Sequence, residues 1–106
     1  MWTVEYLDER AKAEVEAFPR DARSRFERIV GLIKTEGLHK MREPYVKHLE
    51  GKLWEMRLKG RDGIARSLYV TAIGKRVVVV HSFVKKTEKT PRREIELALI
   101  RAKDVK

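Results

Sequence analysis

Four cations in the second half of the sequence have the residue types and spacing to bind a phosphate ester. Arg57 and Arg66 lie in two neighbouring apolar stretches, and Lys85 and Lys86 directly follow a third. Side chains on neighbouring antiparallel strands can meet on one face of a sheet. Clustered Arg and Lys repel one another unless an anion joins them, and a phosphodiester is the obvious anion. We therefore predict an anion site from these four residues, although each taken singly fits a solvated strand residue or an ion-pair partner equally well.

The two lysines begin the most basic segment of the chain. Residues 84–93 read Val-Lys-Lys-Thr-Glu-Lys-Thr-Pro-Arg-Arg, with five basic residues and one acid. An apolar strand pattern precedes this segment and an apolar helical pattern follows it. The segment is therefore expected to be a loop held by folded structure, unlike a disordered polybasic tail.

The positive charge is concentrated in the C-terminal two thirds of the chain. The net charge is +9; residues 1–37 hold seven Lys/Arg against eight Asp/Glu, and residues 38–106 hold eighteen against eight. Charge gathered in this way is typical of nucleic-acid binding, because cations displace the counterions condensed on phosphate. An acidic protein partner also fits this charge. Further candidate contacts to an RNA or ribosome backbone are Lys47, Lys52, Lys59, Arg61, Lys89 and Arg92.

A general base is harder to assign than the cations. A lysine serves as a base when burial and neighbouring cations lower its pKa, and Lys85 and Lys86 both have neighbouring cations. His81 has the more convenient ordinary pKa, about 6.5. Strand alternation, however, places His81 on the face of Val77 and Val79, which favours a packed structural histidine.

Several kinds of chemistry are excluded by what the sequence lacks. There is no cysteine, so disulfides and thiolate catalysis are excluded, and His39, His48 and His81 are too scattered for a metal motif. No phosphate-binding glycine loop occurs, and we expect neither a metal nor a cofactor. No apolar run is long enough to span a membrane, and no signal pattern begins the chain, so we expect a cytoplasmic protein with no membrane partner.

Helical patterns dominate the N-terminal part. Residues 2–6 predict a first strand, and Asp8 suits the N-cap of a short helix that ends before Pro19. A longer helix is predicted from Pro19 to Gly37. Its apolar stripe is Ala22, Phe26, Ile29, Val30 and Ile33. Residues 38–51 show no clear period and are expected to be irregular.

A period of two begins at residue 52 and predicts a meander of three antiparallel strands. The strands are predicted at residues 52–58, 64–71 and 76–84, with turns at 60–63 and 73–75. Trp54 and Phe83 are the aromatic candidates for stacking a base, but Trp54 shares its face with Met56 and Leu58, which favours the core. The valine run of the third strand indicates burial on both faces.

A last helix follows the basic loop. Thr90 and Pro91 suit its N-cap and first position. Its inward stripe is Ile95, Ala98, Leu99 and Ala102, and Leu97 and Ile100 are expected to reach the core as well. The chain is thus predicted to be one α+β domain, residues 1–106, of order β-α-α-β-β-β-α. Its curved, mainly antiparallel sheet is expected to carry the helices on one face.

Specific segments resemble a known family. Residues 49–57 (Leu-Glu-Gly-Lys-Leu-Trp-Glu-Met-Arg), residues 66–69 and residues 81–91 resemble the HigB-type branch of the RelE/ParE toxin superfamily, including its phage-derived members. The resemblance follows nearly the whole domain in element order. Its most specific part is the Phe-x-Lys-Lys-Thr-x-Lys-Thr-Pro loop at residues 83–91.

This resemblance implies a small RelE-like fold and a ribosome-dependent endoribonuclease that cuts messenger RNA and is neutralised by a helix-turn-helix antitoxin. The ribose 2′-hydroxyl attacks the adjacent phosphorus without a metal. Arg57, Arg66 and Lys86 match basic positions of the superfamily. Some relatives carry a tyrosine near the active site, and its absence after Tyr69 suggests that a lysine leads the mechanism.

Two other functions fit the sequence in part. A ParE-like inhibitor of DNA gyrase has no need of a cationic catalytic cluster, so the paired arginines and lysines disfavour it. A non-catalytic RNA-binding or translation-regulating module needs the same charge and no general base, and the sequence separates it poorly from the nuclease.

Overall fold

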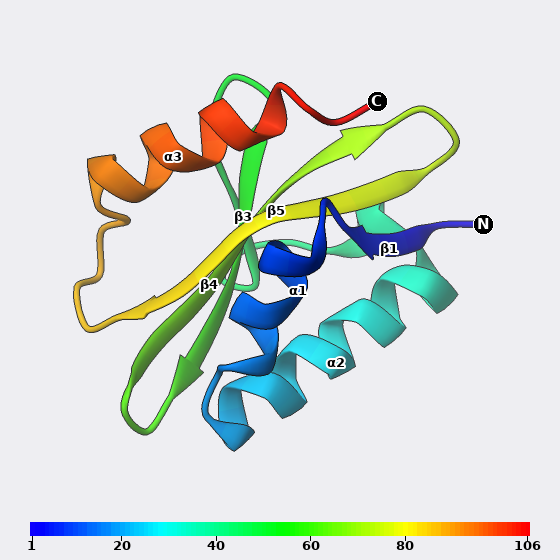
Figure 1. Ribbon diagram of the computed structural model, residues 1–106. Coiled ribbons are helices and arrows are strands. Elements are labelled where there is room, and N and C mark those ends of the chain that lie inside the picture. The colour runs from blue at the N-terminus through cyan, green and yellow to red at the C-terminus, as the bar shows by residue number, and fades with distance from the viewer.

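A five-stranded sheet forms the centre of the structure, a computed structural model that describes residues 1–106 (Figure 1). In chain order the elements are β1 (Thr3–Tyr6), α1 (Glu9–Glu16), α2 (Arg20–Glu36), a short 3₁₀ helix η1 (Leu38–Lys40), β2 (Val46–Glu50), β3 (Leu53–Gly60), β4 (Gly63–Ala72), β5 (Arg76–Lys85) and α3 (Arg92–Ala102). The α+β class is confirmed, as are the first strand, the two N-terminal helices, the meander and the last helix.

The strand order across the sheet is β1-β5-β4-β3-β2. The strands from β2 to β5 pair antiparallel, whereas β1 pairs parallel with β5. Because β3 and β4 are joined at Gly60 and Gly63 by a two-residue turn, every residue of one strand has a fixed partner on the other. This register decides which cations face one another.

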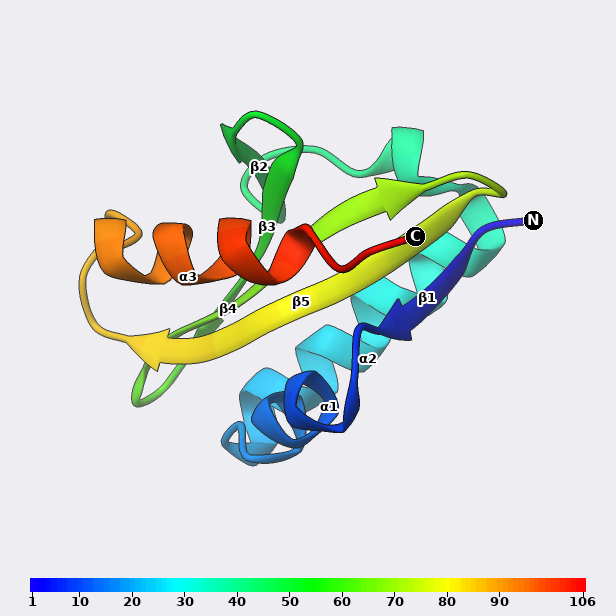
Figure 2. The ribbon, with the colours of Figure 1, turned by 45° about the horizontal axis from the view of Figure 1, so that its top comes forward.

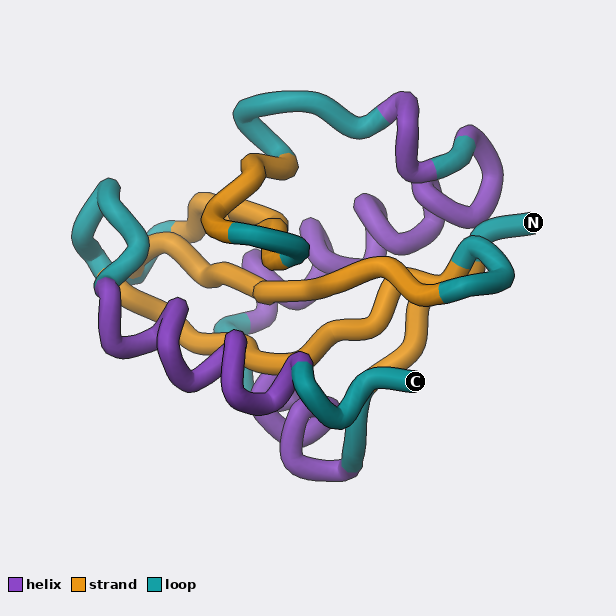
Figure 3. The backbone as a smooth tube through the Cα atoms, turned by 90° about the horizontal axis from the view of Figure 1, so that it is seen from above, coloured by secondary structure: helices purple, strands orange, loops and turns teal.

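The two faces of the sheet carry different helices. Val77 and Val79 of β5 pack in a core with α2, whereas Val78 and Val80 pack with Ala98 of α3 in a second core. Figures 2 and 3 show the sheet between α2 and α3. The expectation that the helices share one face therefore holds for α1 and α2 but not for α3. Strands β4 and β5 are buried on both faces along most of their length, so each face has a cover.

Helix α1 follows β1 and lies next to β5, beyond the point where β1 ends. Asp8 caps this helix as predicted, since its carboxylate accepts a hydrogen bond of 2.8 Å from the Ala11 amide. Glu14 of α1 then accepts the backbone N–H of Ser82, at 3.0 Å. A side chain thereby replaces the strand partner that β5 lacks beyond β1. No helix in the structure combines the length and apolar character needed to cross a bilayer.

Four local expectations are wrong. Residues 46–50 form the edge strand β2, in which Val46 alone is buried, so no apolar period marked the strand. Trp54 is 39 % exposed and lies against His48, with ring centroids 5.0 Å apart. Leu97 and Ile100 are exposed on α3, because Ala98 already fills the contact with the sheet. Thr90 does not cap α3; Pro91 holds the N-cap position.

Candidate functional site

Arg57 and Arg66 lie directly opposite each other on β3 and β4. Arg66 in turn pairs with Phe83 of β5, and its guanidinium carbon lies 6.0 Å from the centre of that ring. The row Arg57, Arg66, Phe83 lies on the face covered by α3. The sequence prediction that the two arginines meet on one face is confirmed.

The Glu55 carboxylate lies near both guanidinium groups and offsets part of their positive charge. Its carboxylate is 3.4 Å from Arg57 Nε and 3.9 Å from Arg66 Nε, and it accepts a hydrogen bond from the Thr90 hydroxyl. The carboxylate is almost fully buried, at 1 % exposure. Both Nε atoms are buried without a hydrogen-bond acceptor, so the carboxylate attracts them by charge alone.

The basic loop closes over the arginines with its own backbone. Arg66 Nη2 donates to the Thr87 carbonyl and, at 3.1 Å, to the Glu88 carbonyl; Arg57 Nη2 also donates to the Glu88 carbonyl. The Glu88 carboxylate adds ion pairs of 3.6 Å to Arg57 and 3.9 Å to Lys59. Carbonyl and carboxylate oxygens thus occupy positions that oxygens of a phosphate could take.

Burial distinguishes the two arginines. Arg66 is 0 % exposed, whereas the Arg57 side chain keeps 16 % of its surface open. Burial and the neighbouring Arg57 charge lower the pKa of Arg66 from its ordinary value, although guanidinium stays protonated at any physiological pH. A phosphate can therefore reach Arg57 directly, and it can reach Arg66 only when the loop carbonyls move aside.

Three further candidate cations line a hollow that Glu88 connects to Arg57. Lys59, Arg61 and Lys86 share this open hollow with the acids Asp62 and Glu88, between the β3–β4 turn and the start of the basic loop. Lys86 is exposed and forms no ion pair within 4 Å, which leaves its ammonium group available to a ligand.

Asp21 holds the β3–β4 turn in place. Its carboxylate accepts the backbone N–H of Arg61 at 2.8 Å and that of Ala22 at 2.9 Å. Gly60 lies so close that an added Cβ would be 2.9 Å from the Asp21 carboxylate. The first turn of α2 therefore fixes the turn that carries Lys59 and Arg61.

This anchor predicts a defined dependence of stability on pH. The Arg61 amide holds the pKa of Asp21 below its ordinary range, so the stabilisation is complete above about pH 4 and is lost as the pH falls through the lower folded-state pKa. We expect Asp21→Asn to lower Tm by a few degrees at pH 7 and to flatten the fall of Tm between pH 4 and pH 2. Thermal melts over that range measure both effects. An unchanged acid slope would contradict the assignment.

His81 lies in a buried polar network, on the α3 face. Its Nδ1 lies 3.1 Å from Arg101 Nη1, and its Nε2 lies 2.6 Å from Glu94 Oε1. Because a carboxylate accepts, Nε2 donates its proton to Glu94, while Nδ1 lies between the donor Arg101 Nη1 and the acceptor Glu14 Oε1, which is 3.4 Å away. Both nitrogens of the candidate base are therefore engaged within the protein, which favours the structural interpretation.

The face occupied by His81 differs from the one that alternation predicted. Leu68 pairs with His81 and Tyr69 pairs with Val79, which leaves Val80 as an extra residue in β5. This bulge reverses the alternation. His81 therefore faces α3 with Leu68, away from the side of Val77 and Val79.

Lys85 is connected to the same network. Its Nζ is 3.9 Å from Glu94 Oε2, while the other oxygen of that carboxylate contacts His81. The side chain is half exposed. Glu94 thus links the first lysine of the basic loop to the buried histidine.

The remaining candidates do not join the cluster. Arg92 is bound by the carboxylates of Glu50 and Glu96, and the Glu50 partner raises its pKa. Lys52 lies in the β2–β3 turn, at the opposite end of β3 from Lys59, and Lys89 is exposed on the basic loop. Lys47 lines a groove beside α2, on whose wall Arg57 and Lys59 also lie.

Sequence reasoning missed three residues that organise the site: Glu55, Glu88 and Thr90. The position of Glu55 was detectable, because it alternates with Arg57 on the same face of β3. The return of Glu88 and Thr90 onto the arginines had no signal, since a loop has no period. No three His, Asp or Glu side chains are arranged to hold a metal ion.

Comparison with known proteins gives one match. The family model described as "Phage derived protein Gp49-like (DUF891)" matches residues 13–103, from α1 to the end of α3. It therefore includes Arg57, Arg66, the basic loop and the buried network. No curated protein matches the chain.

Proposed function

Because the chain belongs to the phage-derived Gp49-like family, which is RelE-like and toxin-like, we propose that it is the toxin of a type II toxin–antitoxin pair. In this proposal it is a ribosome-dependent endoribonuclease of the HigB type that cuts messenger RNA and arrests growth. Its partners are messenger RNA, the ribosome and a helix-turn-helix antitoxin. The observation that carries the proposal is the cross-strand pair Arg57 and Arg66, whose guanidinium groups contact the backbone of the basic loop that also carries Lys86.

The proposed reaction is an internal transfer at phosphorus. The ribose 2′-oxygen forms a bond to the adjacent phosphorus while the bond to the 5′-oxygen breaks, which leaves a 2′,3′-cyclic phosphate and a 5′-hydroxyl. The proton leaves the 2′-hydroxyl and another arrives at the 5′-oxygen, so no water is consumed. The pentacoordinate phosphorus carries extra negative charge in the transition state.

Arg57, Arg66 and Lys86 would stabilise that charge. Each donor aimed at a developing oxyanion typically contributes about 10²–10³-fold in rate. Lys85 and Lys86 are the candidates for proton transfer, since both ring nitrogens of His81 are engaged. Glu55 would fix the directions of the two guanidinium groups while the loop oxygens give way to RNA.

Induced expression with mapping of cellular RNA ends tests this function. We expect growth arrest together with new 5′-hydroxyl ends inside reading frames. Arrest with intact messengers would contradict the nuclease and would favour another toxin target. A small helix-turn-helix protein encoded by the adjacent reading frame would support the antitoxin partner.

One observation favours a second candidate, a non-catalytic RNA-binding module. Arg66 is fully buried and its Nη2 is engaged by loop carbonyls, so the closed site offers charge without exposing the complete cation pair. Such a module would bind RNA and leave it uncut. The same mapping of RNA ends separates the two functions.

A further inference from the structure

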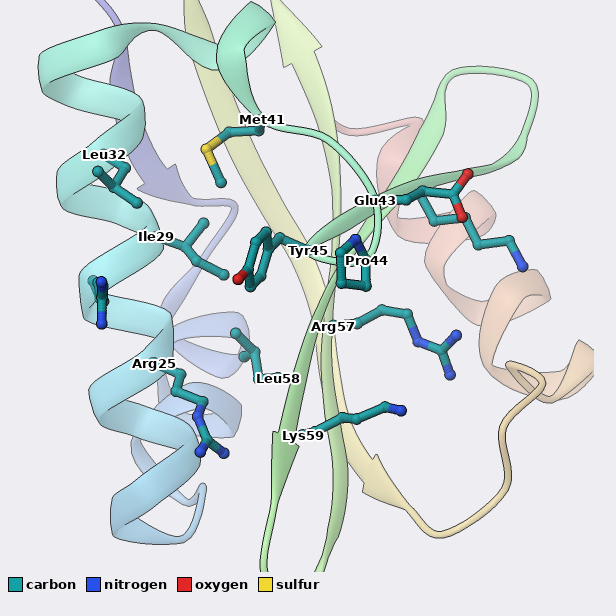
Figure 4. Close-up of a pocket in the computed structure, with 12 residues that line it drawn as sticks. Arg25, Ile29, Leu32, Met41, Glu43, Pro44, Tyr45, Arg57, Leu58 and Lys59 are labelled. Atoms are coloured by element: carbon teal, nitrogen blue, oxygen red, sulfur yellow. The ribbon is translucent and has the colours of Figure 1, made fainter.

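The surface also has a groove that Arg57 lines in part. This groove of about 500 Å³ runs between α2, residues 41–47 and the edge of β3. Figure 4 shows Tyr45 within it, between Ile29 of α2 and Pro44. The other apolar side chains that line the groove are Leu32, Met41 and Leu58.

The sheet register explains why this groove exists. Val46, the first residue of β2, pairs with Met56, so β3 has no strand partner on this side beyond Arg57. The Arg57 amide donates to the Tyr45 carbonyl at 2.9 Å, which holds the Tyr45 backbone at the end of the ladder. The Tyr45 backbone is therefore anchored at the groove while 56 % of the residue stays exposed.

Positive charge surrounds the groove. Its charged lining residues are one acid, Glu43, and the five cations Arg25, Arg28, Lys47, Arg57 and Lys59. Three of these cations form no ion pair within 4 Å: Arg25, Arg28 and Lys47. A ligand with several negative charges can therefore bind here without displacing a protein carboxylate from those three.

The accessible apolar surface is small. Ile29 and Leu58 are buried, and the exposed apolar lining residues are Leu32, Pro44 and Tyr45. An amphipathic helix of a protein partner needs a stripe that accepts anchors at i, i+3, i+4 and i+7. One exposed aromatic ring among cations suits a nucleobase with its flanking phosphates, because bases stack on aromatic side chains and phosphates bind Arg and Lys.

We propose that this groove binds one unpaired nucleotide of single-stranded RNA, with its base against Tyr45 and its phosphates at Arg28 and Lys47. The inference rests on the proposed function, because Arg57 lines the groove and also contacts the loop above Arg66. A strand whose phosphate lies at Arg57 thus has a neighbouring nucleotide at the groove. The groove is the subsite that positions that strand.

Methyl NMR of the intact protein tests the proposal with hexauridylate and hexaadenylate as probes. We expect the Met41 and Leu32 methyl signals to shift on titration. Tyr45→Ser should weaken binding about tenfold, within the range that one lost base stack costs, whereas Tyr45→Phe keeps the wild-type affinity. Arg28→Gln should weaken binding more than Arg20→Gln, which removes the same charge from an exposed position of α2 outside the groove.

Three outcomes would overturn the proposal: unshifted groove methyls at saturating RNA, an unchanged affinity of Tyr45→Ser, or groove shifts caused by polyglutamate and not by RNA. The last result would assign the groove to an acidic protein. Because the measurement is of binding, it is independent of cleavage. Groove shifts with RNA that the isolated protein leaves uncut would support this subsite, and the mapping of cellular RNA ends would still decide whether the protein cleaves messengers on the ribosome.

Discussion

Lys86→Ala is expected to reduce messenger cleavage roughly 10²–10³-fold while Tm stays unchanged. Lys86 is exposed, forms no ion pair and shares a hollow with Lys59 and Arg61. The substitution therefore removes no ion pair of the folded state, and we expect it to lower the rate of cleavage without lowering stability. Cleavage of a defined messenger on purified ribosomes, followed by primer extension, measures the effect.

The matched control is Lys103→Ala. Lys103 is an exposed lysine that follows α3, so this variant removes the same charge away from the site. We expect cleavage close to that of the wild type. Equal losses in the two variants would show that Lys86 acts only through net charge, and wild-type cleavage by Lys86→Ala would remove it from the mechanism.

Lys86→Arg separates two roles of the lysine. An arginine keeps the positive charge, but guanidinium does not lose its proton in proteins. If Lys86 stabilises charge on phosphorus, the arginine variant should recover much of the activity. If Lys86 transfers the proton, the arginine variant should be as inactive as the alanine variant.

The sequence was sufficient for the register of the cation pair. A two-residue turn between Gly60 and Gly63 fixes the pairing of β3 with β4, and Arg57 then necessarily faces Arg66. Period-two alternation also makes the face of Glu55 predictable, since Glu55 lies two residues before Arg57 on β3. These features are local, because a short turn determines which residues of the two strands lie opposite each other.

Other features depend on contacts that no local pattern encodes. The bulge at Val80 turns His81 to the opposite face, and nothing in a run of four valines marks which one is extra. The edge strand β2 was missed because it has few buried side chains. The closure of the loop depends on backbone carbonyls of Thr87 and Glu88, which every residue possesses and no sequence pattern distinguishes.

The largest effect on stability is expected from Arg66→Met. This change leaves Glu55 buried with Arg57 as its one remaining ion-pair partner, and breaking a buried pair costs about 3–5 kcal/mol. For a domain of this size, Tm should fall by roughly 12 °C or more. Arg76→Met is the control, because it breaks the more exposed Arg76–Glu5 ion pair, which is screened by solvent, and should therefore lower Tm much less than Arg66→Met.

The double variant Arg66→Met with Glu55→Gln separates structure from chemistry. The second substitution removes the buried carboxylate that has lost one of its two arginine partners and keeps an amide oxygen as acceptor for the Thr90 hydroxyl, so most of the lost stability should return. Cleavage should stay low, because the transition state still lacks the Arg66 charge. If cleavage returned together with Tm, Arg66 would be a structural partner of Glu55, and catalysis would rest on Arg57 and the two lysines. Restored stability without cleavage would place Arg66 among the groups that act on RNA, and would require the Thr87 and Glu88 carbonyls to move aside when RNA binds.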